Sequence, residues 1–267
     1  MTGVITLVRH SLRRWRGFLA ATTLVLVVFQ FFMILAARSL ELSGRFRLLE
    51  AVLPAFMTEA SNMIAASFTG FVLFGYSHPL VQLFLIATAI ALGSEPAAEI
   101  DTKFIDLLMS RPLPRTAPIN RTLVMLILAA VGAMVCMLAA TWSGLRLLAP
   151  ASARQPTARV VVSLAANLAC LVLAWGGMTV ALASLSRRRS TVAATTGLLA
   201  FTMSVLDYVG RFWDAVAPIA RVSPFHYFDP FGMMGGQPLA TSNVVTLLSI
   251  FVAGAVIANI AYARRDL

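Results

Sequence analysis

The sequence predicts an all-α membrane protein in which six transmembrane helices follow an N-terminal amphipathic helix lying in the membrane interface. Of the 267 residues, 59% are hydrophobic and only 12% are charged, whereas soluble domains carry about 25% charged residues. The apolar residues gather in runs of about 20, the length that crosses a bilayer. Basic residues flank these runs and form no long patch with aromatics, so the net charge of +10 does not indicate nucleic-acid binding.

The first expected element is an interfacial, or elbow, helix over residues 1–16. Its residues separate into an apolar and a basic face at helical spacing. The apolar face consists of Ile5, Val8, Leu12 and Trp15, and the basic face of Arg9, Arg13 and Arg16. A helix of this kind lies in the headgroup plane with its basic side toward anionic lipid. The alternative is an ordinary positively charged flank of the first span.

Six apolar runs follow this helix. They cover residues 17–37, 78–93, 122–142, 160–185, 191–208 and 244–261. Residues 62–76 are also apolar, and Pro79 is expected to break or kink a helix that continues through them. Whether 62–76 is a re-entrant segment or the beginning of the second span stays open. Cys136 and Cys170 lie inside spans, so neither a disulfide nor a metal site is expected.

The distribution of Lys and Arg predicts that the N-terminus is cytoplasmic. With that orientation 13 of the 21 basic residues fall inside and 8 outside, in the sense that the positive-inside rule requires. An even number of spans then places both termini in the cytoplasm. The first apolar run is too long for a signal-peptide core and no small-residue cleavage site follows it, so no cleaved leader is expected.

The loop over residues 94–121, between the second and third spans, is unusually rich in charge. Its segment 95–115 reads EPAAEIDTKFIDLLMSRPLPR and holds four carboxylates and three basic residues. On a helix, one face would carry Ile100, Phe104, Leu107 and Leu108, and the other would carry Glu95, Glu99 and Asp106. We therefore expect a short cytoplasmic helix with an apolar and an acidic side, which is either solvated or docks on a partner.

One local feature is expected to stabilise this loop helix, and another is expected to end it. Glu99 and Lys103 are spaced i, i+4 in the orientation that favours an ion pair. Pro112 and Pro114 are expected to end the helix, because proline lacks the backbone N–H and clashes with the preceding turn.

No enzyme motif occurs in the chain. Lys103 is the only lysine, and no glycine-rich loop precedes it, so a phosphate-binding loop is not predicted. Within the predicted spans the only carboxylate is Asp207, whereas ion-coupled carriers generally need buried ionisable groups. We therefore expect a protein that is not an enzyme, has no cofactor or metal of its own and takes its energy from elsewhere.

The outer loop over residues 209–243, before the last span, is rich in aromatics and turn formers. Aromatic residues at this depth usually form an interfacial belt. The alternative is a gate or exit lip over a substrate path. The residues that would form such a lip are Phe225, His226, Tyr227 and Phe228.

Residues 98–115 resemble a family motif, G-E-I-E-x-G-T-L-D-L-L-L-S-x-P-V-S-R, between the second and third spans of permease subunits of ABC type-2, exporter-type transporters. The matching positions, without a gap, are Glu99, Ile100, Asp101, Asp106, Leu107, Leu108, Ser110, Pro112 and Arg115. Lys103 and Phe104 replace the usual Gly-Thr, and Pro114 replaces Ser. The layout is also similar, with an elbow helix, six spans and Ser223-Pro224-Phe225-His226-Tyr227 before the last span.

This resemblance implies a transport function with a separate motor. Two permease copies, identical or different, would pair with two cytoplasmic ATPases that bind ATP and Mg, and would export a lipid, peptide or hydrophobic small molecule across the bacterial inner membrane. The loop would dock into an ATPase cleft. The expected coupling residues are Glu95, Glu99, Ile100, Asp101, Phe104, Asp106, Leu108, Arg111 and Arg115. The alternative is a non-transporting, membrane-anchored assembly or maturation factor that docks a partner through the same loop.

Overall fold

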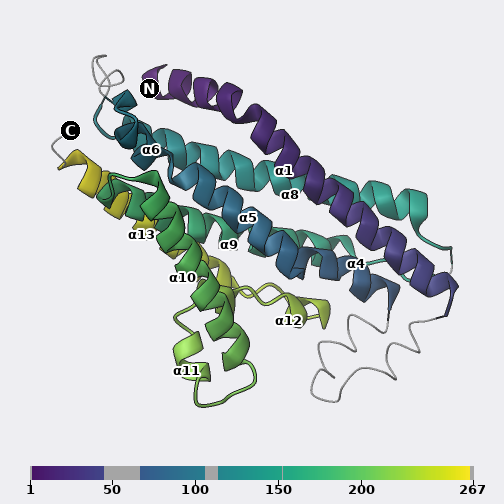
Figure 1. Cartoon of the computed structure of the whole chain (residues 1–267). Helices are drawn as coiled ribbons and strands as arrows, with labels where there is room; N and C mark the ends of the chain where they lie inside the picture. The colour runs from purple at the N-terminus through teal and green to yellow at the C-terminus, as the bar shows by residue number, and fades with distance from the viewer. Residues whose placement is uncertain (1, 45–66, 106–113, 152, 265–267) are drawn as a thin grey trace.

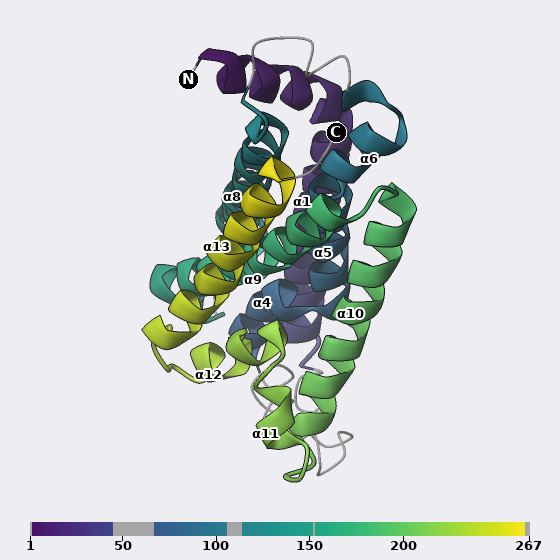
Figure 2. The same cartoon turned by 90° about the vertical axis from the view of Figure 1, so that its left-hand side faces the viewer.

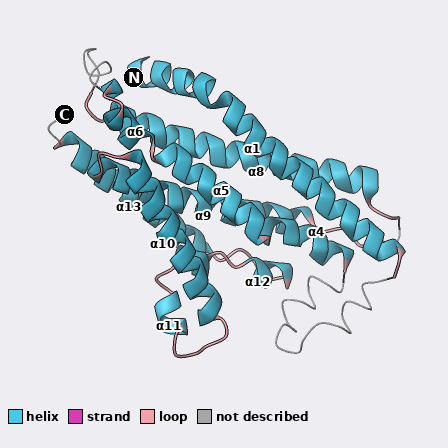
Figure 3. Cartoon of the chain, in the orientation of Figure 1, coloured by secondary structure: helices cyan, strands magenta, loops and turns pink. Residues whose placement is uncertain are grey.

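The computed structural model describes residues 2–44, 67–105, 114–151 and 153–264. In these residues the chain is helical with no strand, and six helical segments are long and apolar enough to cross a membrane. The spanning helices are α1 (Thr2–Leu42), α4 (Phe68–Ser77) together with α5 (Pro79–Gly93), α8 (Ala117–Leu148), α9 (Ala158–Leu185), α10 (Arg189–Gly210) and α13 (Thr241–Ala263). The predicted fold class is confirmed, and Figure 3 shows how short most of the connecting loops are.

The first helix combines two elements that the sequence analysis treated separately. Residues 2–16, called here the N-terminal arm, and the first span form one continuous helix, α1. Figure 2 shows that the first turns of α1 lie across one end of the bundle, while the rest of the helix runs along it. The arm thus differs in direction from the span that follows it, and the expected boundary after residue 16 is a bend and not a helix end.

The second spanning segment is interrupted where proline predicts it. His78 adopts φ −60° and ψ 130°, which ends α4, and Pro79 begins α5. The side chain of Ser67 accepts a hydrogen bond from the Gly70 N–H (3.0 Å) and caps the start of α4. Residues 68–77 thus form the first part of the second spanning segment, whereas residues 62–66 lie outside the described part of the chain.

Helix α9 occupies the centre of the bundle. It packs against α5, α8 and α13, and α1 packs along α8 (Figure 1). The side chain of Trp175, in the middle of α9, is completely buried. Gly177 of α9 faces Gly254 of α13 so closely that a Cβ on Gly177 would lie 2.8 Å from the Cα of Phe251. Small residues allow this approach, as is common between membrane helices.

The two ends of the bundle differ. The N-terminal arm, the short helix α6 (Glu95–Asp101) and the last turn of α13 gather at one end, called here the α6 end (Figure 1). The opposite end carries α11 (Ala217–Ala220), the 3-10 helix η2 (Pro224–Tyr227) and α12 (Pro230–Met234). Since α1 begins and α13 ends at the α6 end, both are expected on the same side of the membrane.

Cysteine labelling tests this topology. Ser186 lies in the α9–α10 connection, next to the α6 end, and the exposed Thr157 lies before α9 at the opposite end. In a variant with Cys136 and Cys170 replaced by serine, an impermeant thiol reagent added outside intact cells is expected to label Thr157→Cys but not Ser186→Cys. The reverse pattern would place the α6 end outside.

Candidate functional site

The charged loop of the α6 end begins with a helix that ends earlier than the expected stop at Pro112 and Pro114. Helix α6 runs from Glu95 to Asp101, and Lys103 then adopts a positive φ of 57°, the left-handed conformation that commonly ends helices. Phe104 and Ile105 are helical again after this break. The predicted i, i+4 pair between Glu99 and Lys103 is therefore wrong, because the two residues do not belong to one continuous helix.

The two carboxylates of α6 point into the protein. Glu95 and Glu99 are each 2% exposed, and both contact Arg121 of α8, which is 3% exposed. Arg121 Nη1 lies 2.6 Å from Glu99 Oε1, and Arg121 Nη2 lies 3.7 Å from Glu95 Oε2. Burial raises the pKa of the Glu99 carboxyl, and the neighbouring Arg121 guanidinium opposes that rise. We call Glu95, Glu99 and Arg121 the buried charge cluster.

The N-terminal arm joins this cluster from the side. Trp15 Nε1 donates a hydrogen bond to Glu95 Oε1 (3.1 Å), and Arg14 Nη1 lies 3.5 Å from the same oxygen. Arg189, at the start of α10, donates from Nε to Ser94 Oγ (3.3 Å), and its guanidinium carbon lies 5.8 Å from the ring centre of Trp15. One polar network therefore connects α1, α6, α8 and α10.

This arrangement corrects the predicted acidic outer face of the loop. Glu95 and Glu99 were expected to point toward a partner, but they lie inside the bundle because Arg121 supplies a buried countercharge. A carboxylate can be buried when it is paired in this way. Because each carboxylate is only 2% exposed, neither can contact another protein unless α6 moves.

The other predicted coupling residues fall into three groups. Asp101 and Arg115 are exposed, and Phe104 is 37% exposed, so these side chains are accessible to a partner. Ile100 is half-buried and packs against the main core, and it thereby attaches the loop to the helix bundle. Asp106, Leu108 and Arg111 lie outside the described residues.

Sequence reasoning missed several members of the site. Trp15 is predicted only as part of the apolar face of the arm, and Arg14, Arg121 and Arg189 enter the prediction only among the 13 basic residues expected inside. The available signal was the position of Arg121 in the sequence. It directly precedes the apolar run of the third span and follows a loop that contains Glu95 and Glu99. No local pattern, however, indicates that Arg189 lies beside Trp15, because they are distant in the chain.

An open groove of about 570 Å³ lies at the surface of the α6 end. The arm forms one wall, and α6 with the residues that follow it forms the other. The lining residues are His10, Arg14, Trp15, Glu95, Ala98, Glu99, Asp101, Thr102, Lys103, Phe104 and Arg189. The groove thus combines two aromatic rings with charges of both signs, and its base is held by the buried charge cluster.

The predicted gate residues lie at the opposite end and divide into buried and exposed side chains. Phe225 and Phe228 are buried, and the Phe225 ring packs on Trp175 of α9 with ring centres 5.6 Å apart. The side chain of His226 is 43% exposed, and its Nδ1 lies 3.8 Å from Oδ1 of Asp207. Tyr227 is half-buried. The segment is thus anchored in the bundle by its phenylalanines.

A second contact region attaches this segment to α10. Ser223 Oγ donates to the carbonyl of Met203 (2.9 Å), and Asp207 forms an ion pair with Arg211 (2.9 Å). Asp207, the single carboxylate expected within the spans, thus pairs with the residue that ends α10, at the end of the bundle opposite to α6.

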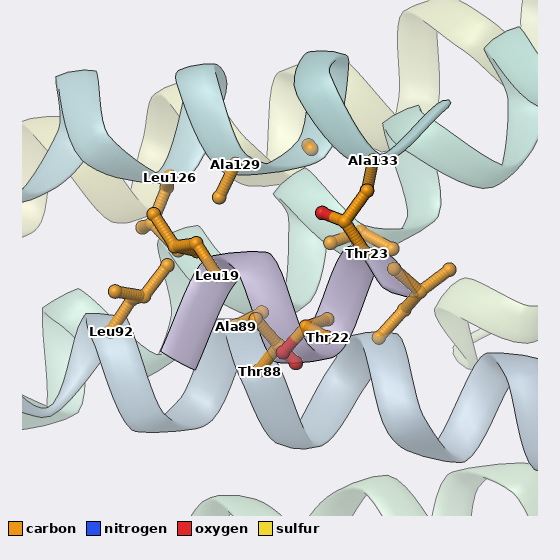
Figure 4. A pocket seen from close by; sticks show the side chains of 12 residues that line it. Leu19, Thr22, Thr23, Thr88, Ala89, Leu92, Leu126, Ala129 and Ala133 are labelled. Carbon is orange, nitrogen blue, oxygen red and sulfur yellow. The ribbon is translucent and has the colours of Figure 1, made fainter. Parts of the chain in front are cut away.

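A small cavity lies between α1, α5, α8 and α9 (Figure 4). Thr22, Thr23 and Thr88 line it together with alanines and leucines, and the Thr22 hydroxyl has no hydrogen-bond partner within the described part of the chain. Its volume of about 20 Å³ admits one water molecule. The cavity is too small for an organic substrate.

No protein-family model matches the chain, and no curated protein is significantly similar to it.

Proposed function

We propose that the chain is the permease subunit of an ATP-binding-cassette exporter, and that a separate ATPase docks at the α6 end. The proposal rests on the resemblance of residues 98–115 to the loop motif of such permeases, together with a multi-pass helical fold. In this proposal the α6 end is cytoplasmic, two permease copies act together, and the substrate is a lipid, peptide or hydrophobic small molecule exported across a bacterial inner membrane.

The open groove of the α6 end is the observation that supports docking most directly. Phe104 and Trp15 offer partly exposed aromatic surface, and Asp101 and Lys103 add charges of both signs at the edge. Apolar contacts surrounded by charged residues are typical of protein interfaces. The apolar contacts supply the binding energy and the charges set the orientation, because an exposed ion pair contributes only about 0–1 kcal/mol.

The buried charge cluster gives the loop a means of moving the spans. Arg121 is part of α8, Arg14 and Trp15 are part of α1, and both helices contact α6 through Glu95 or Glu99. Separating a buried ion pair costs several kcal/mol. A displacement of α6 therefore moves α1 and α8 with it, because the contacts of the buried charge cluster stay intact. Such a linkage suits a motor that acts from outside the membrane.

The described parts of the spanning helices contain few of the ionisable groups that an ion-coupled carrier uses. Among the described residues of the spanning helices, the only carboxylates are Glu41 and Asp207, each in the last turn of its helix. A proton or ion relay requires ionisable groups deeper in the membrane. The shortage supports an external energy source, and residues 223–228 would then gate the outer end of the substrate path.

Co-purification of a cytoplasmic ABC ATPase with this chain from its native host tests the proposal. Phe104→Ala is expected to reduce the amount of ATPase recovered with the permease by up to about ten-fold, equivalent to roughly 1.4 kcal/mol of lost apolar contact. Asp101→Asn is expected to reduce it by less than about five-fold, since the carboxylate is exposed.

Phe201→Ala is the matched control, because Phe201 is 68% exposed on α10 and does not line the groove. Its ATPase recovery is expected to equal that of the wild type. If no ATPase co-purifies with the wild-type chain, the assembly-factor alternative gains support. If Phe104→Ala recovers as much ATPase as Phe201→Ala, the groove is not the docking site.

A further inference from the structure

One buried hydroxyl group of α1 has no partner among the described residues. Thr22 is 2% exposed, and its Oγ1 atom takes part in no hydrogen bond within them. Thr88 of α5 and Thr179 of α9, by contrast, each donate to the carbonyl four residues earlier in their own helix, at 2.9 and 2.7 Å. A buried hydroxyl without a hydrogen bond is strongly unfavourable, so the surroundings of Thr22 Oγ1 decide what satisfies it.

The small cavity of Figure 4 lies beside this hydroxyl. Thr22 and Thr23 line it from α1 and Thr88 lines it from α5, whereas the other lining residues are alanines, leucines and one valine. Its volume of about 20 Å³ exceeds the roughly 10–15 Å³ that one water molecule needs. A purely apolar cavity of this size stays empty, but a cavity with two or more polar groups can hold water. This cavity meets both requirements.

The register of α1 against α5 and α6 places Thr22 opposite Thr88. At the α6 end, Trp15 donates to Glu95 (3.1 Å). Thr22 follows Trp15 by seven residues, and Thr88 precedes Glu95 by seven residues. Seven residues are about two helical turns, and α1 and α5 run in opposite directions (Figure 1), so the same two faces meet again at Thr22 and Thr88. Figure 4 shows these two side chains reaching toward each other.

From these observations we propose that one water molecule is bound in the cavity and bridges Thr22 of α1 to Thr88 of α5. The hydroxyl proton of Thr88 is donated to the carbonyl of Phe84, so Thr88 Oγ1 is left as an acceptor. The water donates one hydrogen to Thr88 Oγ1, and its oxygen accepts the hydrogen of the Thr22 hydroxyl. Thr23, which lines the same cavity, is the candidate acceptor for the second hydrogen of the water.

The bound water joins α1 to α5 and α6 at a second level. The first level is the contact between Trp15 and Glu95, and the water lies two helical turns, about 10 Å, further along the bundle. A water-mediated hydrogen bond is nearly as favourable as a direct one, and two contacts at different depths oppose rotation of α1 against α5 better than one. This inference does not depend on the ATPase, and a failure of either proposal leaves the other intact.

A double-mutant cycle with isosteric substitutions tests the bridge in the full-length chain. Threonine to valine removes the hydroxyl group at nearly constant shape, and the unfolding equilibrium is measured for the purified protein in detergent. Thr22→Val is expected to raise the equilibrium constant for unfolding by about five-fold, because the water loses a partner. A hydroxyl group without a partner predicts the opposite sign. In Thr22→Val/Thr88→Val the increase is expected to be about five-fold smaller than the product of the two single effects, since the same bridge is lost only once.

Thr179→Val is the matched control, because Thr179 is also completely buried but does not line the cavity. Its effect is expected to multiply with that of Thr22→Val without coupling. NMR of the protein with ¹³C-labelled threonine methyl groups distinguishes a bound water from a direct contact between the two hydroxyl groups. A cross-peak with water is expected at the methyl groups of Thr22 and Thr88 but not at that of Thr179. An unchanged or lowered unfolding constant in Thr22→Val, no coupling between Thr22 and Thr88, or coupling without the water cross-peak would each overturn the proposal.

Discussion

Replacement of Arg121 by methionine is expected to lower the free energy of unfolding by about 3–5 kcal/mol, because it leaves two buried carboxylates without their shared countercharge. Glu95 and Glu99 are both 2% exposed, and among the described residues Arg121 is the one buried cation that contacts them. Unfolding of the purified protein in detergent, followed by circular dichroism against denaturant, measures the difference.

Arg115→Met is the matched control, since Arg115 lies just before the same helix but is exposed. It is expected to change stability by less than about 1 kcal/mol. Combining Arg121→Met with Glu95→Gln and Glu99→Gln is expected to recover most of the loss, because the uncompensated charges are then gone. Equal stability of Arg121→Met and Arg115→Met would show that the cluster is not buried as described.

The pH dependence of the Arg121→Met variant follows from the pKa of Glu99. Burial raises this pKa above the ordinary value of 4.5, and Arg121 holds it down. Without Arg121 the pKa rises further, so the folded variant binds a proton that the unfolded chain has released. Its stability is therefore expected to increase as the pH falls through the folded pKa toward 4.5. Adding Glu99→Gln should remove this part of the pH dependence, since an amide does not titrate.

Substitution of Gly254 by leucine is expected to cost about 3 kcal/mol, the upper part of the usual range for overpacking. A Cβ on Gly254 would overlap the backbone of Gly177, and backbone atoms cannot move aside as the end of a flexible side chain can. The α9–α13 contact would have to open, and it is the most extensive helix contact in the described chain. The same detergent unfolding experiment measures the loss.

Gly132→Leu serves as the comparison, because nothing lies within 4 Å of a Cβ at Gly132 of α8. Leucine there is expected to be neutral or slightly stabilising, since glycine is the poorer helix former. If both substitutions had the same effect, the close approach of α9 and α13 would not contribute to stability.

Much of the fold could be predicted because it depends on local properties of the chain. The six spans follow from runs of apolar residues, and the break between α4 and α5 follows from Pro79. The bend that replaces the predicted boundary after residue 16 could not be read in this way. It depends on the contacts of Trp15 and Arg14 with α6, which lies 80 residues further along the chain.

In the candidate site, too, some features could be predicted from the sequence and others depend on contacts between distant residues. The sequence indicated that the loop 94–121 is charged and that it resembles a coupling loop, and these conclusions need only the order of residues. It could not indicate that Glu95 and Glu99 point inward, because an acidic stripe on a helix is compatible with water or with a buried cation. Which of the two occurs depends on where Arg121 of α8 comes to lie after the helices pack.

By itself, therefore, the sequence determined the membrane class, the number of spans, the place of the proline break and the charged character of the loop, since hydropathy and proline act within a few residues. The tertiary structure alone decided the central position of α9, the packing of Phe225 on Trp175 and the partners of every buried charge. The physical reason is that burial and ion pairing depend on the countercharges and surfaces that distant helices bring together, and the free energy of a buried charge changes by several kcal/mol with its partner.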